Sequence, residues 1–224
     1  MAILNNDQIK DYIKRGEICF NPPLDKFQVK PHAVDLRMGF VFLLPKQWYL
    51  DSSGRRSLNI DHYDVNKKEY FDVIELKPGQ TFDLLPEEYV IVSTLEKIKV
   101  PKDLMSILYP RSSTNRKGLS VDLTGIIDAG YEGPLMIPIR NNTRSQVVKL
   151  YPGERFCQIV FERLDESLKK SPGKENRYHK VDFKKAFTKV NSINNKNKDE
   201  ELEKEYVSKG KIDLLKKKFK EGGK

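Results

Sequence analysis

The most chemically suggestive part of the sequence is residues 125–138, which place Asp128 between an apolar run and a glycine-rich turn. Tyr131 follows three residues later, and Gly130 and Gly133 give the backbone freedom that a tight hairpin requires. A carboxylate that a rigid strand delivers into such a turn is well placed to meet a small ligand. A lone aspartate in a turn more often only caps that turn, so a functional role for Asp128 needs evidence from other parts of the chain.

A second stretch, residues 109–119, sets three consecutive hydroxyl side chains between basic ones. The members are Arg111, Ser112, Ser113, Thr114, Arg116 and Lys117. Hydroxyls and backbone amides near a helix start donate to oxyanions, and guanidinium groups bind phosphate through two parallel hydrogen bonds. An ordinary helix N-terminal cap would explain the same residues equally well.

A third stretch, residues 152–158, uses a Pro-Gly turn to set Arg155 and Gln158 at the start of a strand. The Gln158 amide could donate to a phosphate or to a base. Each of the three turns carries polar side chains next to a strand, and this pattern predicts that the three turns line one shared pocket.

The elements that must position these turns are mainly short strands. Apolar runs separated by Pro and Gly turns predict an antiparallel sandwich or jelly roll, a mainly β fold. Residues 5–16 predict a short amphipathic helix with an asparagine cap. Val34, Leu36 and Met38 alternate with charged residues, as in a half-buried strand, and Asp35 is expected to steady Arg37 on the same face. Residues 46–72 are polar and predict an excursion from the fold.

Composition limits the class of protein. The chain has 224 residues, 38% of them hydrophobic and 33% charged, which fits a globular protein with a polar appendage. Membrane-length apolar runs, a signal peptide and a zinc pattern around Cys19 or Cys157 are all absent from the sequence, so we expect a cytoplasmic protein. The net charge is +9, of which residues 165–224 contribute +7, so the body does not predict specific nucleic-acid binding.

The pattern changes beyond residue 164, and we expect three parts. Residues 1–164 form the catalytic jelly roll, residues 165–198 a basic, turn-rich segment and linker, and residues 199–224 a charged helical extension. Ile212, Leu215 and Phe219 would give that extension a narrow apolar stripe.

The order and spacing of the three turns resemble a known superfamily. Residues 110–113, 125–133 and 152–158 resemble three signature motifs of the dUTPase and dCTP deaminase superfamily, and Ala33-Val-Asp-Leu-Arg37 resembles its first motif. The opening helix and the arginine–serine stretch are more similar to the dCTP deaminase branch, including the archaeal bifunctional enzymes. The resemblance covers roughly residues 3–180.

The resemblance implies a distorted jelly roll (a dUTPase-like β-clip), assembled as a homotrimer with active sites at subunit interfaces. It implies nucleotidohydrolase chemistry, in which water attacks the α-phosphorus of dUTP to give dUMP and pyrophosphate. Mg²⁺ would be bound mainly by the triphosphate and water, with no dedicated metal site. Asp128 would orient or deprotonate the water, and backbone groups of residues 125–138 would select the base. The substrate-binding residues would be Arg111, Ser112, Ser113, Arg116, Tyr131, Arg155, Gln158 and Tyr178, the last within a candidate lid that could equally be a charged linker.

The choice between hydrolysis and deamination depends on one strand position. Deaminases of this superfamily use a Glu after the hairpin, and that position is Pro138 here; Glu132, in the turn, is not accepted as its substitute. The motifs of zinc deaminases are also missing. We therefore predict a dUTP diphosphatase that forms dUMP and pyrophosphate. The alternatives are a dCTP deaminase or a bifunctional deaminase and dUTPase, and, from another class, an inactive nucleotide-binding or protein-interaction jelly roll.

Overall fold

The structure is a computed structural model that describes residues 2–59, 61, 69–122, 125–169, 198–212 and 214. These residues divide between two compact units, residues 1–45 with 73–181 and residues 46–72 with 182–224. The expected excursion at residues 46–72 thus belongs to a unit separate from the body.

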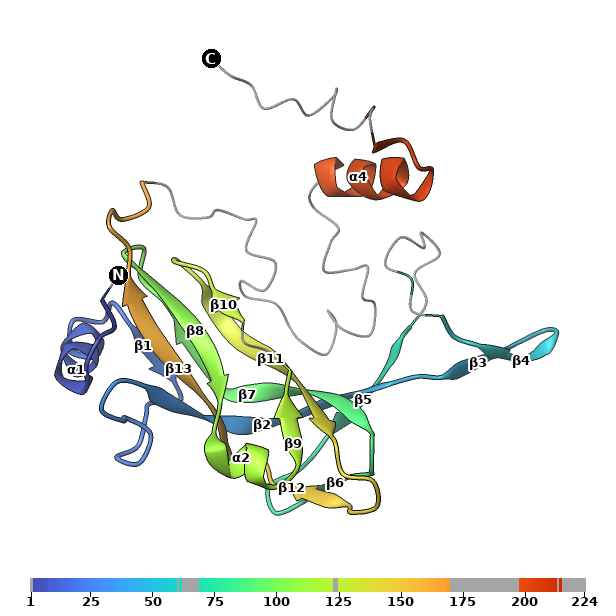
Figure 1. The fold of residues 1–224 in the computed structure, drawn as a ribbon, viewed down its shortest axis with the longest axis horizontal. Coiled ribbons are helices and arrows are strands. Elements are labelled where there is room, and N and C mark those ends of the chain that lie inside the picture. The colour runs from blue at the N-terminus through green and yellow to red at the C-terminus, as the bar shows by residue number, and fades with distance from the viewer. Residues whose placement is uncertain are drawn as a thin grey trace. The chain divides into compact units, whose positions relative to one another are not determined.

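The body of the protein is built on one antiparallel sheet (Figure 1). Its main path runs β10–β8–β13–β2–β7–β11–β9, with β1 beside β7 and β5 beside β2. In Figure 1, β8 and β13 run steeply while β2 and β7 run nearly horizontally, so the sheet curls. The strands of this sheet are β1 (Cys19–Asn21), β2 (Val34–Pro45), β5 (Phe71–Glu75), β7 (Tyr89–Lys99), β8 (Leu104–Pro110), β9 (Leu119–Val121), β10 (Ile126–Ile127), β11 (Glu132–Asn141) and β13 (Arg155–Arg163).

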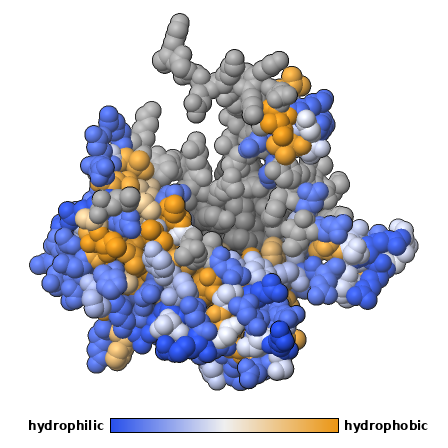
Figure 2. All heavy atoms as spheres, viewed as in Figure 1, coloured by the Kyte–Doolittle hydropathy of each residue, from blue (hydrophilic) through white to orange (hydrophobic). Residues whose placement is uncertain are grey.

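The remaining elements are short. Two separate strand pairs are formed by β6 (Phe82–Leu84) with β12 (Val148–Leu150) and by β3 (Trp48–Asp51) with β4 (Gly54–Ser57). The helices are α1 (Asn6–Lys14), α2 (Ser112–Arg116) and α4 (Lys198–Ser208). The side chains of the β3–β4 hairpin are mostly exposed, and its visible surface is largely hydrophilic (Figure 2). The predicted mainly β fold, with a short first helix and a charged C-terminal helix, is confirmed.

The first helix forms for the reasons that the sequence suggests. Asn5 caps it, since the Asn5 side chain accepts from the Gln8 backbone N–H and the Gln8 side chain accepts from the Asn5 N–H. Ile9 is fully buried, and the Tyr12 hydroxyl donates to Asp103 Oδ2 at 2.6 Å. This apolar face fixes α1 to the body.

The core lies on the inner face of the curled sheet. Alternate residues of β11 show the arrangement, because Ile137 and Ile139 are buried while Met136, Pro138 and Arg140 lie on the more exposed face. The side chains of the paired strands β7 and β9 follow the same alternation, which leaves one face of this part of the sheet available for polar chemistry. Among the described residues, no helix is long and apolar enough to span a membrane.

Candidate functional site

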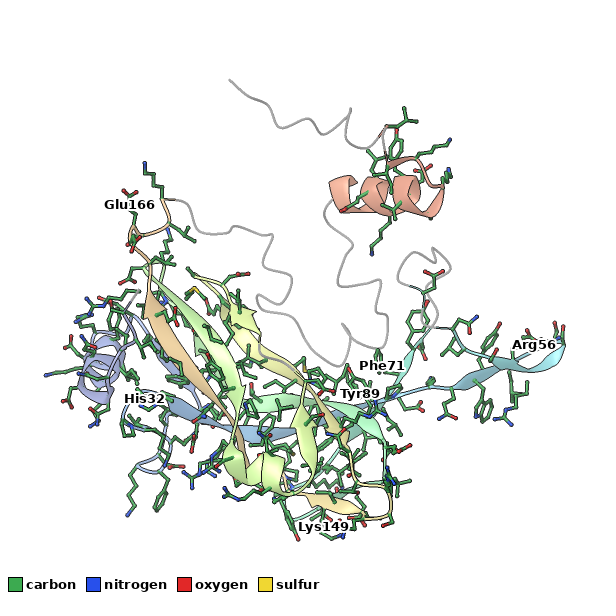
Figure 3. The ribbon with its side chains drawn as sticks, viewed as in Figure 1. His32, Arg56, Phe71, Tyr89, Lys149 and Glu166 are labelled. Atoms are coloured by element: carbon green, nitrogen blue, oxygen red, sulfur yellow. The ribbon has the colours of Figure 1, made fainter. Side chains whose placement is uncertain are left out.

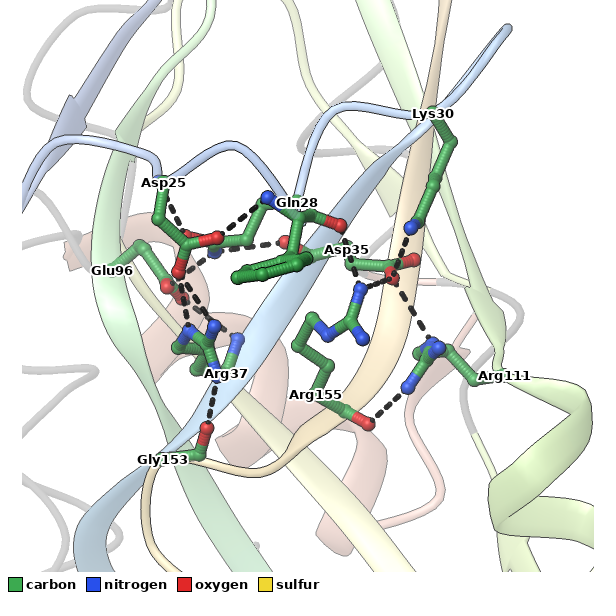
Figure 4. A network of polar contacts seen from close by, with 10 residues as sticks. Asp25, Gln28, Lys30, Asp35, Arg37, Glu96, Arg111, Gly153 and Arg155 are labelled. Carbon is green, nitrogen blue, oxygen red and sulfur yellow. Dashed lines mark hydrogen bonds and ion pairs between the residues drawn. The ribbon is translucent and has the colours of Figure 1, made fainter.

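Asp35 on β2 is the centre of a cationic cluster that the sequence did not predict (Figure 4). Its carboxylate is 1% exposed, and Oδ2 lies 3.1 Å from Arg111 Nε, 3.1 Å from Arg155 Nη1 and 3.8 Å from Lys30 Nζ. Oδ1 is buried and has no hydrogen-bond partner in the described part of the chain. We call Lys30, Asp35, Arg111 and Arg155 the arginine cluster. Three cations around one carboxylate leave it a net positive charge, which suits an anionic ligand.

The sheet register brings the two arginines together. β13 pairs with β8 so that Cys157 lies opposite Pro110, and the Arg111 N–H donates to the Phe156 carbonyl at 3.1 Å. Arg111 Nη1 also donates to the Arg155 carbonyl at 2.9 Å. Arg155 Nη1 donates in turn to the Phe27 carbonyl at 2.6 Å. The backbone therefore fixes both guanidinium groups before any ligand arrives.

The three hydroxyls after Arg111 divide into two kinds. Arg111 itself takes the cap position of α2 with extended backbone, and no side chain makes a cap hydrogen bond, so the ordinary cap interpretation does not explain the serines. The Thr114 hydroxyl is buried and donates to the Phe156 carbonyl at 2.8 Å, a structural role. Ser112 is exposed and Ser113 half-buried beside the arginine cluster.

Two further predicted residues lie at the same end of β8. Gln158 is opposite Tyr109, and its Nε2 is 3.4 Å from the Pro110 carbonyl, a long contact that leaves the amide able to turn to a ligand. Arg116, at the end of α2, is exposed and forms no hydrogen bond or ion pair with the described side chains. The structure thus brings Arg111, Arg155 and Gln158 to one end of β8, and Ser112, Ser113 and Arg116 follow on α2.

Asp128 lies at the other end of β8. Ile127 is opposite Ser106 in an antiparallel ladder, so Asp128 is level with Met105, six positions before Arg111. At about 3.3 Å per strand residue, Asp128 and Arg111 are about 20 Å apart in one chain. Figure 1 shows α2 at one end of β8 and the β10–β11 connection towards the other. A single chain therefore does not bring the three predicted turns into one pocket.

The hairpin around Asp128 is rigid although Asp128 itself is exposed. The Tyr131 N–H donates to the Asp128 carbonyl at 3.1 Å, and the Gly130 N–H donates to the Pro101 carbonyl at 3.2 Å. Tyr131 is only 6% exposed, and its hydroxyl donates to the Pro134 carbonyl at 2.6 Å. Its ring therefore forms part of the apolar core and can form a wall beside Asp128.

The expected partnership of Asp35 with Arg37 is not formed. Arg37 Nη2 pairs with Asp25 Oδ2 at 2.5 Å, and Arg37 Nη1 donates to the Gly153 carbonyl at 2.6 Å. The strand is also not half-buried here, because Val34, Asp35 and Leu36 are all buried. A buried aspartate must be paired with a cation or hydrogen-bonded. An aspartate between the apolar residues Val34 and Leu36 was therefore the one signal in the sequence that could have indicated the arginine cluster.

A second buried carboxylate supports this region. Glu96 on β7 is 1% exposed and accepts from Gln28 Nε2 at 2.7 Å and from the Arg37 N–H at 2.9 Å. Burial raises the pKa of Glu96 above its ordinary value, and those hydrogen bonds oppose the rise. Gln28 Nε2 also donates to the Asp35 carbonyl at 3.0 Å, so this network links Glu96 to the arginine cluster. The sequence analysis did not identify Glu96 or Gln28.

Pro138 occupies the strand position at which the sequence analysis sought a deaminase glutamate. It lies within β11 between Ile91 of β7 and the end of β9. The Asp122 N–H donates to the Pro138 carbonyl at 3.1 Å. Because proline has no N–H to return that bond, the ladder between β11 and β9 ends at this pair. We call β9, β10 and β11, with Asp122 and Asp128, the acidic region.

The predictions about a lid and a metal site concern different parts of the chain. Tyr178 and the candidate lid lie outside the described residues. Within the described ranges, no group of three or more His, Cys, Asp or Glu side chains could hold a metal ion.

Together these observations define a class: a mainly β protein whose curled sheet carries a positively charged arginine cluster and a separate carboxylate hairpin. The chain belongs to the dCTP deaminase-like family, whose model matches residues 3–164. The suspected membership of the dUTPase and dCTP deaminase superfamily is confirmed.

Relatives and solved structures agree with this membership. The chain is 36% identical over 168 residues to "dCTP deaminase, dUMP-forming" of Methanobrevibacter smithii, which covers 73% of this chain and 81% of that protein. It is 35% identical over 184 residues to the protein of the same name from Dictyoglomus thermophilum, covering 81% and 88%. The crystal structure of 2'-deoxycytidine 5'-triphosphate deaminase from Agrobacterium tumefaciens shares the fold, with a TM-score of 0.53 and 24% identity over 72% of this chain and 48% of that one.

These comparisons correct the predicted function. The prediction of a dUTP diphosphatase, and of dUTP nucleotidohydrolase as the enzyme class, is wrong, because the relatives at 34–36% identity are dCTP deaminases. The alternative that included dCTP deamination is better supported. The choice of hydrolysis over deamination rested on Pro138 alone. It did not consider residues of the neighbouring strand, whose side chains lie on the same face of the sheet as Pro138.

Proposed function

We propose that the protein converts dCTP to dUMP by two hydrolytic steps. Water replaces the amine at C4 of the base, and water cleaves the bond between the α- and β-phosphates, so that dCTP and two waters give dUMP, ammonia and pyrophosphate. The observation that carries this proposal is 36% identity over 168 residues to a dCTP deaminase that forms dUMP. The proposal also covers a cytoplasmic location and entry of the substrate as its Mg²⁺ complex.

The arginine cluster is proposed to hold the triphosphate. Its contacts with the described residues use Nε and Nη1 of Arg111 and Nη1 of Arg155, so each Nη2 group keeps donors for phosphate oxygens. Ser112, Ser113, Arg116 and Gln158 lie around it and add further donors. Phosphoryl transfer depends mainly on such positioning and charge neutralisation, so a preformed cluster lowers the barrier.

Asp128 is proposed to orient and deprotonate the water that attacks the α-phosphorus. Because Asp128 and Arg111 are about 20 Å apart within a chain, a complete site requires the arginine cluster of a second copy. The homotrimer with interfacial sites that the resemblance implies supplies that second copy. The buried ring of Tyr131 would then close the sugar side of the site.

The test is incubation of the purified protein with dCTP and Mg²⁺, followed by separate measurement of ammonium, pyrophosphate and nucleotide. We expect ammonium and pyrophosphate in equal amounts, together with dUMP. Absence of ammonium with dCTP left intact would overturn the proposal, and binding without turnover would favour a nucleotide-binding protein instead. Light scattering on the same sample tests the trimer.

A further inference from the structure

Removing the amine from the base requires a proton-transfer group that the phosphate chemistry does not provide. The attacking water must lose a proton, and the leaving amine must gain one. The zinc motifs that serve this purpose in other deaminases are absent from the sequence. If the proposed function holds, on which this inference rests, a carboxylate near the acidic region is the natural candidate.

Several carboxylates near the site are already committed to other contacts. Asp35 is held by the arginine cluster, Glu96 accepts from Gln28 and from a backbone N–H, and Asp103 accepts from the Tyr12 hydroxyl. Asp128 is assigned to the phosphate step. The acidic region carries two further carboxylates among the described residues, Asp122 and Glu132.

The sheet register distinguishes these two. Ile139 lies opposite Val121, so Asp122 lies directly opposite Pro138, whereas Glu132 lies opposite Lys99 near the other end of β11. Paired residues in an antiparallel ladder send their side chains to the same face. Asp122 therefore presents its carboxylate beside Pro138, at the strand position where the superfamily resemblance looks for an acid. Six strand residues, or about 20 Å, separate Glu132 from that position.

The surroundings of Asp122 suit a working carboxylate. Its side chain is exposed, while its backbone N–H is anchored at 3.1 Å to the Pro138 carbonyl, so the group is accessible but held by a strand. The side chains that share this face include Tyr89, which begins β7 (labelled in Figure 3), and Arg140. Burial, and secondly the Asp122 carboxylate, raise the pKa of Tyr89, so its hydroxyl stays protonated as a possible donor.

An aspartate at this place also fits cytosine better than uracil. Cytosine presents an amine donor at C4, which a carboxylate accepts, whereas uracil presents a carbonyl oxygen that a carboxylate repels. The same group can therefore select the base and move its protons.

We propose that Asp122 is the catalytic acid–base residue for deamination and the residue that selects cytosine. Its carboxylate takes a proton from water as the oxygen bonds to C4, and passes that proton to the amine as the C4–N bond breaks. The hydroxyl left on C4 loses its proton as N3 gains one, so that water and the amino base give the carbonyl base and ammonia, and the carboxylate is regenerated.

The test compares wild type with Asp122→Asn, which keeps the size of the side chain and the backbone hydrogen bond. Ammonium release from dCTP is expected to fall about 100-fold or more, the usual contribution of an acid–base group. Pyrophosphate release from dUTP, used as a probe of the phosphate step, is expected to be kept or to rise, because Asp128 and the arginine cluster are untouched and the carboxylate that repels the uracil carbonyl is removed. Glu132→Gln is the matched control and should keep both rates within about threefold.

The outcomes separate the two proposals. Ammonium release near the wild-type rate from Asp122→Asn would overturn this inference and leave the proposed function standing. Equal loss of both activities, or a lowered Tm, would also overturn it, since it would assign Asp122 a structural role. A wild-type protein that releases no ammonium from dCTP would instead overturn the proposed function.

Discussion

The arginine cluster and the acidic region differ in how their charges are satisfied within one chain. Arg111 and Arg155 share a carboxylate that is 1% exposed, while Asp122 and Asp128 are exposed at strand ends. A buried charge must be paired to be tolerated, whereas an exposed carboxylate on an anchored backbone can be left for ligand. Changes in the first region should therefore alter stability as well as binding, and changes in the second should alter rate alone.

The largest expected effect is on the acidic region. Asp128→Asn removes the proposed base, and dUMP formation is expected to fall about 10³-fold, within the range for general base catalysis. Because Asp128 is exposed, Tm should be unchanged and nucleotide Kd should stay within about tenfold. Steady-state kinetics, calorimetry and thermal unfolding check this, and a wild-type rate would remove Asp128 from the mechanism.

Asp35→Asn should show the opposite behaviour. Removing the charge leaves two guanidinium groups without their buried partner, at a cost of about 3 kcal/mol, the lower end for a broken buried pair. Thermal unfolding should then show Tm lowered by roughly 10 °C. An unchanged Tm would mean that the arginine cluster does not contribute to stability, and the contrast between the two regions would fail.

Arg116→Ala tests an exposed member of the phosphate site. Arg116 is exposed and forms no hydrogen bond or ion pair with the described side chains, so Tm should not change, while KM for dCTP should rise about tenfold as one proposed charge-assisted phosphate contact is lost. Arg144→Ala, another exposed arginine, is the control and should leave KM unchanged. Equal effects of both variants would indicate only general electrostatic attraction.

The smallest effect concerns Glu96. Since burial raises its pKa in the folded state, the folded protein binds this proton more tightly than the unfolded chain. Its contribution to stability is therefore greatest below the ordinary glutamate pKa and is lost as pH rises through the raised value. Tm measured against pH for wild type and Glu96→Met checks this sign, because the variant should lack that decline.

The fold could be predicted from the sequence because local signals agree with the global structure. The Asn5 and Gln8 capping box, the turn glycines and the short apolar runs each indicate an element that the structure contains. The arginine cluster could not be predicted in the same way. Its members come from the loop before β2, from β2, from the α2 cap and from β13, so only the folded structure shows that they meet.

The function was mispredicted for a related reason. The position of the deaminase glutamate was correctly located at Pro138 on β11. In a sheet, however, side chains of neighbouring strands lie on the same face, and Asp122, which follows β9, lies opposite Pro138. Counting positions along one strand does not identify the residues that lie opposite them on the neighbouring strand. Likewise, the prediction of one pocket shared by three turns did not account for the length of β8, which separates two of these turns by about 20 Å within a chain.

The central claim is that the arginine cluster of one copy and the acidic region of another copy complete one site. Subunit complementation tests this claim most directly. Asp128→Asn and Arg111→Gln should each form almost no dUMP from dCTP, the glutamine keeping a donor for Asp35. Mixed and reassembled in equal amounts, they should regain about a quarter of wild-type dUMP formation, since in a random cyclic trimer one site in four combines intact Asp128 with intact Arg111. No recovery in mixed trimers confirmed by mass would contradict the account and place both residues in a site within one chain.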